Sequence, residues 1–240
     1  MAISANDDPA NVLTLPWLTL PTGARAALAE QWAGLASGGL PCGAAIVAAD
    51  DTIIASGHNR AYDPAGEIAT RARYPLQHNR LAHAELNAIA LLPTETDHAP
   101  LTLWTTHHPC AMCAAAIAFV GIGAVRFIAD DPSDHAAPAQ IAATRAGVPY
   151  TALGDPLWWT IANLLFLYNS AVQSGAQAGN LRANRDRYPA LIALTLDLAR
   201  GDDLGTTARA ETPLPIALEP HYTAIAHVCG TATAAMRGVR

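Results

Sequence analysis

Residues 83–113 read HAELNAIALLPTETDHAPLTLWTTHHPCAMC, and this stretch decides which folds the chain can adopt. Residues 84–92 have the apolar spacing of a helix, residues 101–105 the pattern of a buried strand, and residues 111–120 the spacing of a second helix. A strand between two helices indicates an α/β layer architecture.

The flanking sequence extends this alternation in both directions. Upstream, the spacing of apolar residues predicts a helix over 21–38, and short apolar runs predict a strand, a tight turn and a second strand over 43–56. Residues 57–80 form a long irregular stretch, and loops of this length are usually functional or disordered. Downstream, residues 124–129 are predicted to form a strand, and residues 138–153 one more helix and a final strand.

The pattern changes after residue 154. The remaining sequence predicts three helices separated by loops with glycine and proline, over residues 156–174, 188–200 and 222–236. Residues 157–168 are too apolar to stand exposed to water. We therefore expect residues 1–154 to form the main domain, and residues 155–240 to form a helical extension that packs on it or at a dimer interface.

Composition and charge narrow the functional classes. The 240 residues are 51% hydrophobic and 14% charged, which favours a globular protein over a disordered chain. All 14 basic residues are arginines, which excludes a lysine Schiff base and a Walker-type phosphate lysine. The net charge of −6 lies in residues 1–154, with 13 acidic residues and 7 arginines, whereas residues 155–240 are neutral. Because nucleic acids attract basic surfaces, a nucleic-acid partner is disfavoured.

The sequence also bears on location and on cysteine chemistry. It opens without a basic and apolar leader, and its apolar runs are too short to span a bilayer, so we expect a cytoplasmic protein without membrane association. Of its four cysteines, Cys110 and Cys113 form the one close pair. In a chain without a secretion signal, such a pair indicates metal or redox chemistry before a disulfide framework.

Cys110 and Cys113 stand at the start of a predicted helix and have the spacing of metal ligands. Residues three apart on a helix lie about 60° apart around its axis, so both sulfurs can face one point. The helix N-terminus favours the thiolates that zinc requires. His83 is the natural third ligand, which leaves one tetrahedral position for water, as in catalytic zinc sites. His83 and Glu85 can converge on one ion only within the first turn of a helix.

Together, His83-x-Glu85 and Pro109-Cys110-x-x-Cys113 resemble the H-x-E and P-C-x-x-C signature of the zinc-dependent cytidine deaminase superfamily. The resemblance covers about residues 40–131. Flanking segments similar to the family are Pro41-Cys42-Gly43-Ala44-Ala45-Ile46-Val47, Gly57-His58-Asn59 and Leu103-Trp104-Thr105-Thr106.

Within that superfamily, the chain looks most like the branch that deaminates guanine, cytosine or tRNA adenosine. It departs from the branch at the pocket rim, where His108 replaces the usual Glu and Cys42 replaces the usual Phe or Val. The gap from Asn59 to His83 is also longer than in the family. These departures concern the identity of the substrate rather than the chemistry.

The resemblance implies a three-layer α/β/α sandwich around a mixed sheet of about five strands. It implies one zinc ion held by His83, Cys110 and Cys113, with zinc-bound water as the nucleophile that attacks the amino-bearing carbon. Glu85 would shuttle protons to the ring and to the departing ammonia. The residues implied to bind the heterocycle are Asn59, Ala84 through its backbone N–H, and His108.

Each of these assignments has a structural alternative. The three ligands are alternatively a structural zinc site, but such a site needs a fourth ligand. Glu85 is alternatively an ordinary first-turn glutamate, and Asn59 a turn residue. His107 and His108 either line the pocket or occupy a strand end, and neither is assigned as a ligand.

Two further groups of residues have ordinary interpretations that we favour. The arginines of the long loop suggest a phosphate site but are more commonly solvated charges; they are Arg71, Arg73 and Arg80. The aromatic residues of the helix at 156–174 favour packing over stacking on a base; they are Trp158, Trp159, Phe166 and Tyr168.

Three functions follow from the sequence. The leading hypothesis is deamination of a free base or nucleoside by a homodimer. The second is deamination of adenosine in tRNA, which requires an electropositive track that a domain of net charge −6 does not offer. The third is a non-catalytic zinc scaffold subunit, against which the presence of Glu85 argues. The sequence leaves open which ring is deaminated.

Overall fold

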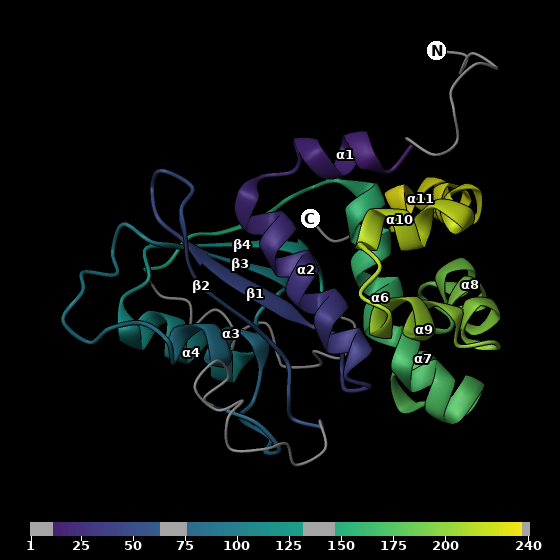
Figure 1. Ribbon diagram of the computed structural model, residues 1–240, viewed down its shortest axis with the longest axis horizontal. Helices are drawn as coiled ribbons and strands as arrows, with labels where there is room; N and C mark the ends of the chain where they lie inside the picture. The colour runs from purple at the N-terminus through teal and green to yellow at the C-terminus, as the bar shows by residue number, and fades with distance from the viewer. Residues whose placement is uncertain (1–11, 63–75, 132–146, 237–240) are drawn as a thin grey trace.

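A mixed five-stranded sheet forms the centre of the computed structural model, which describes residues 12–62, 76–131 and 147–236 (Figure 1). The strands are β1 (Gly43–Val47), β2 (Ile53–His58), β3 (Thr102–His107), β4 (Ala124–Ala129) and β5 (Tyr150–Ala152). They lie in the order β2-β1-β3-β4-β5. β1 pairs antiparallel with β2 and β3, whereas β3, β4 and β5 are parallel.

Helices cover both faces of the sheet. On one face lie α2 (Thr22–Ala36) and α6 (Pro156–Ser174), and on the other lie α3 (Ala84–Ile89) and α4 (Ala111–Val120) (Figure 1). Because successive strand residues point to opposite faces, neighbours in β3 enter different cores. Leu103 packs with α3 and α4, and Trp104 packs with α2 and α6. These layers confirm the three-layer α/β/α sandwich.

The covering helices are joined to the sheet by close packing and buried hydrogen bonds. Gly43 allows α2 to lie directly on β1, because a Cβ atom there would overlap the backbone of Ala27 and Gln31. The Gln31 side chain donates to the carbonyl oxygens of Pro41, at 3.0 Å, and Ala162, at 2.9 Å. Gln31 therefore ties α6 to the entry of β1.

The C-terminal part of the chain is helical, as predicted. After α6 come α7 (Gly179–Asn184), α8 (Pro189–Ala199), α9 (Asp203–Arg209), α10 (Leu214–Leu218) and α11 (Tyr222–Met236) (Figure 1). Helix α6 begins where Asp155 accepts hydrogen bonds from the backbone N–H groups of Leu157 and Trp158. Thirteen of its 19 residues are buried within the chain. Its apolar sequence is thus accounted for without a second copy.

Several details differ from the sequence-based predictions. Helix α1 (Thr14–Thr19), α7, α9 and α10 were not predicted, because helices of five to seven residues show little apolar periodicity. β2 extends to His58, so the predicted irregular stretch starts after it. The helix predicted over 138–146 lies outside the described residues. Among the described helices, none combines the length and apolar character that a bilayer crossing requires.

Candidate metal centre and active site

Two helix N-termini meet at the edge of the sheet where β3 ends. His83 is the N-cap residue of α3, and Cys110, three residues beyond the end of β3, is the N-cap residue of α4. Both have extended backbone conformations, with ψ angles of 155° and 168° respectively. Neither side chain makes a capping hydrogen bond to its helix. The imidazole and the thiol are therefore able to turn towards each other and towards Cys113.

The three side chains form a cluster with the dimensions of a zinc site. His83 Nδ1 lies 3.7 Å from Cys110 Sγ and 3.5 Å from Cys113 Sγ, and all three ligand atoms lie within 4.8 Å of one another. Tetrahedral zinc with Zn–N near 2.05 Å and Zn–S near 2.3 Å separates such nitrogen and sulfur atoms by about 3.5 Å. The two distances from His83 Nδ1 are thus close to those of a tetrahedral zinc site.

The electrostatic environment also suits a cation. A hydrogen bond from Cys113, opposed by burial, lowers the pKa of Cys110 to about 4, and His83 adds to the decrease. The pKa of Cys113 is raised by its hydrogen bond with Cys110 and by burial. The hydrogen bond between the two thiols therefore favours ionisation of Cys110 over that of Cys113. A bound cation displaces the remaining proton, because a coordinating thiol is deprotonated.

Glu85 lies beside the cluster in the first turn of α3. Its Oε2 atom is 3.5 Å from Cys113 Sγ, and its Oε1 atom accepts a hydrogen bond of 3.3 Å from Thr105 Oγ1 on β3. Burial raises the pKa of the Glu85 carboxyl above its usual value. His83 and Glu85 converge because His83 is the N-cap residue, just before the regular helix, and Glu85 lies in its first turn. From the sequence, the two side chains were expected to approach one ion only from such a position at a helix start.

Comparison with known proteins supports the same assignment. Residues 22–129 match the family model described as the cytidine and deoxycytidylate deaminase zinc-binding region. Residues 22–129 are thus similar in sequence to the zinc-binding region of cytidine and deoxycytidylate deaminases. The match begins at α2 and ends at β4, so it contains the metal cluster and four of the five strands.

Proteins similar to this chain differ in the substrates that their names give. A cytosine deaminase of Candida albicans is 30% identical over 102 residues, 41% of this chain and 59% of that protein. The chain therefore spans less than two thirds of the length of that relative. Among solved structures, a guanine deaminase from Nitrosomonas europaea is 23% identical over 60% of this chain and 80% of its own, with a TM-score of 0.45. A tRNA:A34 deaminase is 27% identical over 53% of this chain and 89% of its own, with a TM-score of 0.39.

The structure places the three predicted substrate-binding residues in different settings. Asn59 directly follows β2, is buried, and uses its Oδ1 atom to accept a hydrogen bond from the N–H of Ala61, which leaves its Nδ2 group as the donor for a ligand. Ala84 is the buried first residue of α3, next to His83. The His108 ring packs against Phe127 and Tyr150, with ring centroids 4.8 and 5.7 Å away. The substrate-binding role of all three stays a prediction.

A second buried group adjoins the metal cluster. The His107 ring lies 4.7 Å from the Phe166 ring of α6, and its Nδ1 atom is 3.2 Å from Thr106 Oγ1 and 3.9 Å from Cys42 Sγ. Burial lowers the pKa of His107 to about 3, so the ring is neutral. The sequence pointed to His107 without deciding its role. It gave no signal that Phe166, 59 positions later, would reach it.

The loop arginines do not form a phosphate site in the described part of the chain. Arg80 is exposed, and Arg71 and Arg73 lie outside the described residues.

Thr105 was not singled out from the sequence, and its contact with Glu85 leads to a testable prediction. We expect Thr105→Val to lower kcat by roughly 2- to 12-fold, because a hydrogen bond contributes about 0.5–1.5 kcal/mol. Zinc content should not change, and Thr105→Ser should recover most of the activity. Steady-state kinetics and metal analysis measure both quantities. Thr102→Val, on the same strand, is the matched control, and equal losses in the two valine variants would contradict a positioning role.

Proposed function

We propose that this chain is a zinc-dependent hydrolytic deaminase that converts an amino-bearing ring carbon of a nucleobase or nucleoside to a carbonyl and releases ammonia. The observation that carries the proposal is the place of Glu85, whose Oε2 atom is 3.5 Å from Cys113 Sγ. Among the described residues, the metal cluster consists of His83, Cys110 and Cys113, and Glu85 is not a member. A three-ligand site with an adjacent carboxylate has the composition of a catalytic zinc centre rather than of a closed structural one.

His83, Cys110 and Cys113 would hold a zinc ion, which would lower the pKa of water and so supply a nucleophile near neutral pH. Glu85 would accept a proton from the attacking water through Oε2, while Thr105 holds Oε1. Glu85 would pass this proton to the ring nitrogen next to the attacked carbon, then take the second proton from the hydroxyl now on that carbon and transfer it to the departing amine. Burial of Glu85 keeps bulk water from competing for these proton transfers.

Three residues would hold the ring: Ala84, Asn59 and His108. The backbone N–H of Ala84 belongs to the first turn of α3, where helical N–H groups have no partner within the helix. The Nδ2 group of Asn59 supplies a second donor. Since an analogue that leaves such buried groups unpaired is rejected strongly, these contacts would determine which ring is accepted. His108 would act at the rim of the pocket.

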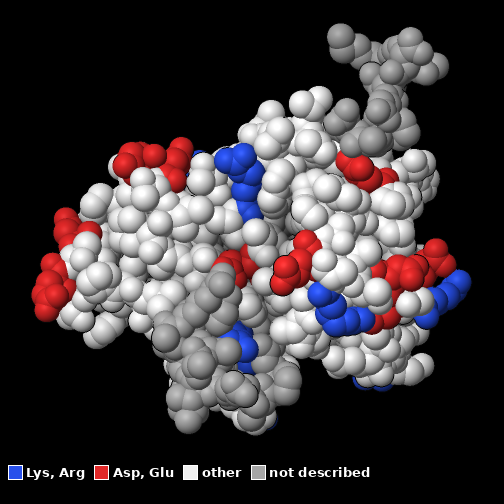
Figure 2. Space-filling model, viewed as in Figure 1, with Lys and Arg blue, Asp and Glu red and all other residues white. Residues whose placement is uncertain are grey.

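Charge supports a small-molecule substrate over tRNA. Figure 2 shows arginines that are few and separated by uncharged surface and acidic groups, without a continuous basic track on the face in view. A tRNA substrate would require such a track to neutralise its phosphates. A homodimer stays part of the proposal, although α6 does not require one.

The test is an ammonia-release screen over free bases, nucleosides, nucleotides and other aminated heterocycles, run beside the Glu85→Ala variant. We expect the zinc-loaded protein to deaminate at least one base or nucleoside, and the Glu85→Ala variant to deaminate none. Parallel assays with adenosine-34 tRNA at low salt distinguish the second candidate. Deamination of tRNA alone would contradict the small-molecule substrate, and a lack of turnover on every substrate would favour the scaffold subunit.

A further inference from the structure

A cavity of about 310 Å³ lies beside the C-terminal half of α6 and is not part of the metal centre. Its walls come from the loop after α2, the segment after β2, and helices α6 and α7. The residues important here are Leu40, Tyr62, Asn169, Ser170, Gln173 and Asn180. Small-molecule sites usually occupy about 300–1,000 Å³, so this volume is enough for one small chemical group.

Short chain segments and side-chain contacts link each wall of the cavity to residues at the end of β3. Leu40 is two residues before Cys42, whose thiol lies 3.9 Å from His107 Nδ1. Tyr62 follows Asn59 by three residues, and the N–H of Asn59 donates to the carbonyl oxygen of Cys42 at 2.9 Å. Because β1 is antiparallel to both β2 and β3, the segments before β1 and after β2 lie at the edge of the sheet where β3 ends.

The third wall is connected through α6. The Phe166 ring contacts the ring of His107, and Ser170 lies one turn further along the same helix. Four residues of helix correspond to a rise of about 6 Å. The cavity therefore lies at the same edge of the sheet as the candidate active site.

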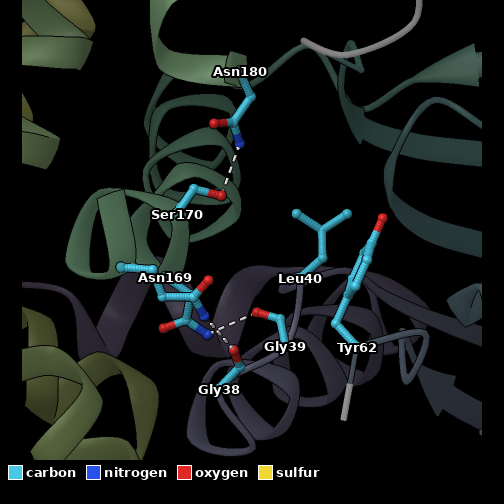
Figure 3. Close-up of a pocket in the computed structure, with 8 residues that line it drawn as sticks. Gly38, Gly39, Leu40, Tyr62, Asn169, Ser170 and Asn180 are labelled. Atoms are coloured by element: carbon cyan, nitrogen blue, oxygen red, sulfur yellow. Dashed lines mark hydrogen bonds between the residues drawn. The ribbon is translucent and has the colours of Figure 1, made fainter. Parts of the chain in front are cut away.

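The two sides of the cavity differ in chemistry. Figure 3 shows Asn169, Ser170 and Asn180 on one side and Leu40 and Tyr62 on the other. Asn180 Nδ2 donates to Ser170 Oγ at 3.0 Å, so the Ser170 hydroxyl proton can be donated to a ligand. The Nδ2 group of Asn169 donates to the carbonyl oxygens of Leu35 and Gly39, so a ligand meets its Oδ1 acceptor.

The opposite side is apolar and open to a ligand. Leu40 presents methyl groups, and Tyr62 presents a ring that is 71% exposed. Among the described residues, those that line the cavity include no Asp, Glu, Arg or His. These lining residues therefore offer a phosphate no cationic partner. A neutral group with several hydroxyls along one edge and a less polar face would match both sides.

We propose that this cavity binds the ribose of a nucleoside, and that the chain acts on nucleosides in preference to the corresponding free bases and nucleotides. The inference rests on the proposed deaminase function and specifies its substrate class. The C-terminal helices supply the polar side of the cavity, and in this way they contribute to specificity.

The test compares kcat/KM for matched pairs: adenosine with adenine, guanosine with guanine, and cytidine with cytosine. For the pair that is deaminated, we expect kcat/KM to be higher for the nucleoside than for the free base or for the nucleoside 5′-monophosphate. Ser170→Leu, which fills the cavity, should lower the nucleoside-to-base ratio of kcat/KM by about tenfold or more. Ser174→Leu, an exposed position one turn further along α6, is the matched control and should leave the ratio as in the unmodified protein.

A second variant and a binding measurement keep the test independent of folding and turnover. Tyr62→Ala removes an exposed side chain and should lower the same ratio. Calorimetric titration with the product nucleosides inosine, xanthosine and uridine should show tighter binding than with hypoxanthine, xanthine and uracil, and Tyr62→Ala should abolish the difference. A free base preferred over its nucleoside, or a ratio unchanged in both cavity variants, would overturn the ribose site. A lack of deamination with every pair would instead overturn the proposed function, whereas nucleoside binding sensitive to Tyr62 would still support the site.

Discussion

Replacement of Glu85 by glutamine is expected to lower kcat for deamination by about 10²- to 10⁴-fold, the range typical of a lost general acid and base. The amide of glutamine preserves the size of the side chain and can still contact Thr105, but it cannot accept and return a proton. Because Glu85 is not one of the three metal ligands, the zinc content should stay at that of the unmodified protein. Steady-state kinetics on the best substrate of the screen, together with elemental analysis, measure both quantities.

Glu95→Gln is the matched control for this experiment, since it makes the same chemical change at an exposed position outside the site. It should leave kcat within the error of the measurement. If Glu85→Gln retained activity close to that of the unmodified protein, the proton-transfer role would be wrong, and Glu85 would be an ordinary first-turn glutamate. If Glu85→Gln lost zinc, Glu85 would have to be assigned to the metal centre.

Replacement of Cys113 by serine is expected to remove zinc and, with it, all measurable deamination. Changes to groups that merely orient metal ligands already cost about 10- to 100-fold in affinity, so loss of a thiolate ligand should cost at least as much. The variant should also melt at a lower temperature than the zinc-loaded protein, because an ion that binds only the folded state stabilises it. Elemental analysis and thermal unfolding in the presence and absence of a chelator test these expectations.

Cys229→Ser provides the comparison for this variant. Cys229 is on α11, outside the metal cluster, so its replacement should preserve zinc and activity. In the unmodified protein and in Cys229→Ser, the chelator should lower the melting temperature, whereas Cys113→Ser should show little further decrease. Full zinc occupancy in Cys113→Ser would show that the ion is held by a different set of residues.

The sequence predicted the site well where function depends on residues within one short segment. Cys110 and Cys113 come together because one is the N-cap residue and the other lies in the first turn of the same helix, and His83 joins them because both helix starts lie at the same edge of the sheet. The resemblance to deaminases supplied the fold class, which the mixed sheet confirms. The helices of five to seven residues could not be predicted, since they are stabilised by tertiary packing more than by local propensity.

Contacts between distant segments could not be predicted from the sequence. The hydrogen bond from Thr105 to Glu85 joins a strand to a helix 20 positions away, and threonine in a strand is too common to mark such a role. The packing of Phe166 on His107 joins α6 to the end of β3. Nothing in the apolar run of α6 indicates which of its aromatic residues faces the site.

The amino-acid sequence by itself determined the metal-binding residues of this protein, because metal ligation requires particular side chains at spacings that a helix start can satisfy. The pattern of His83, Glu85, Cys110 and Cys113 is sufficient for a zinc centre with an adjacent buried carboxylate. Only the tertiary structure decided what surrounds that centre. The cavity formed by Leu40, Tyr62 and the polar face of α6 exists because residues more than 100 positions apart pack on one sheet, and such packing depends on the shape of the whole core rather than on any local pattern.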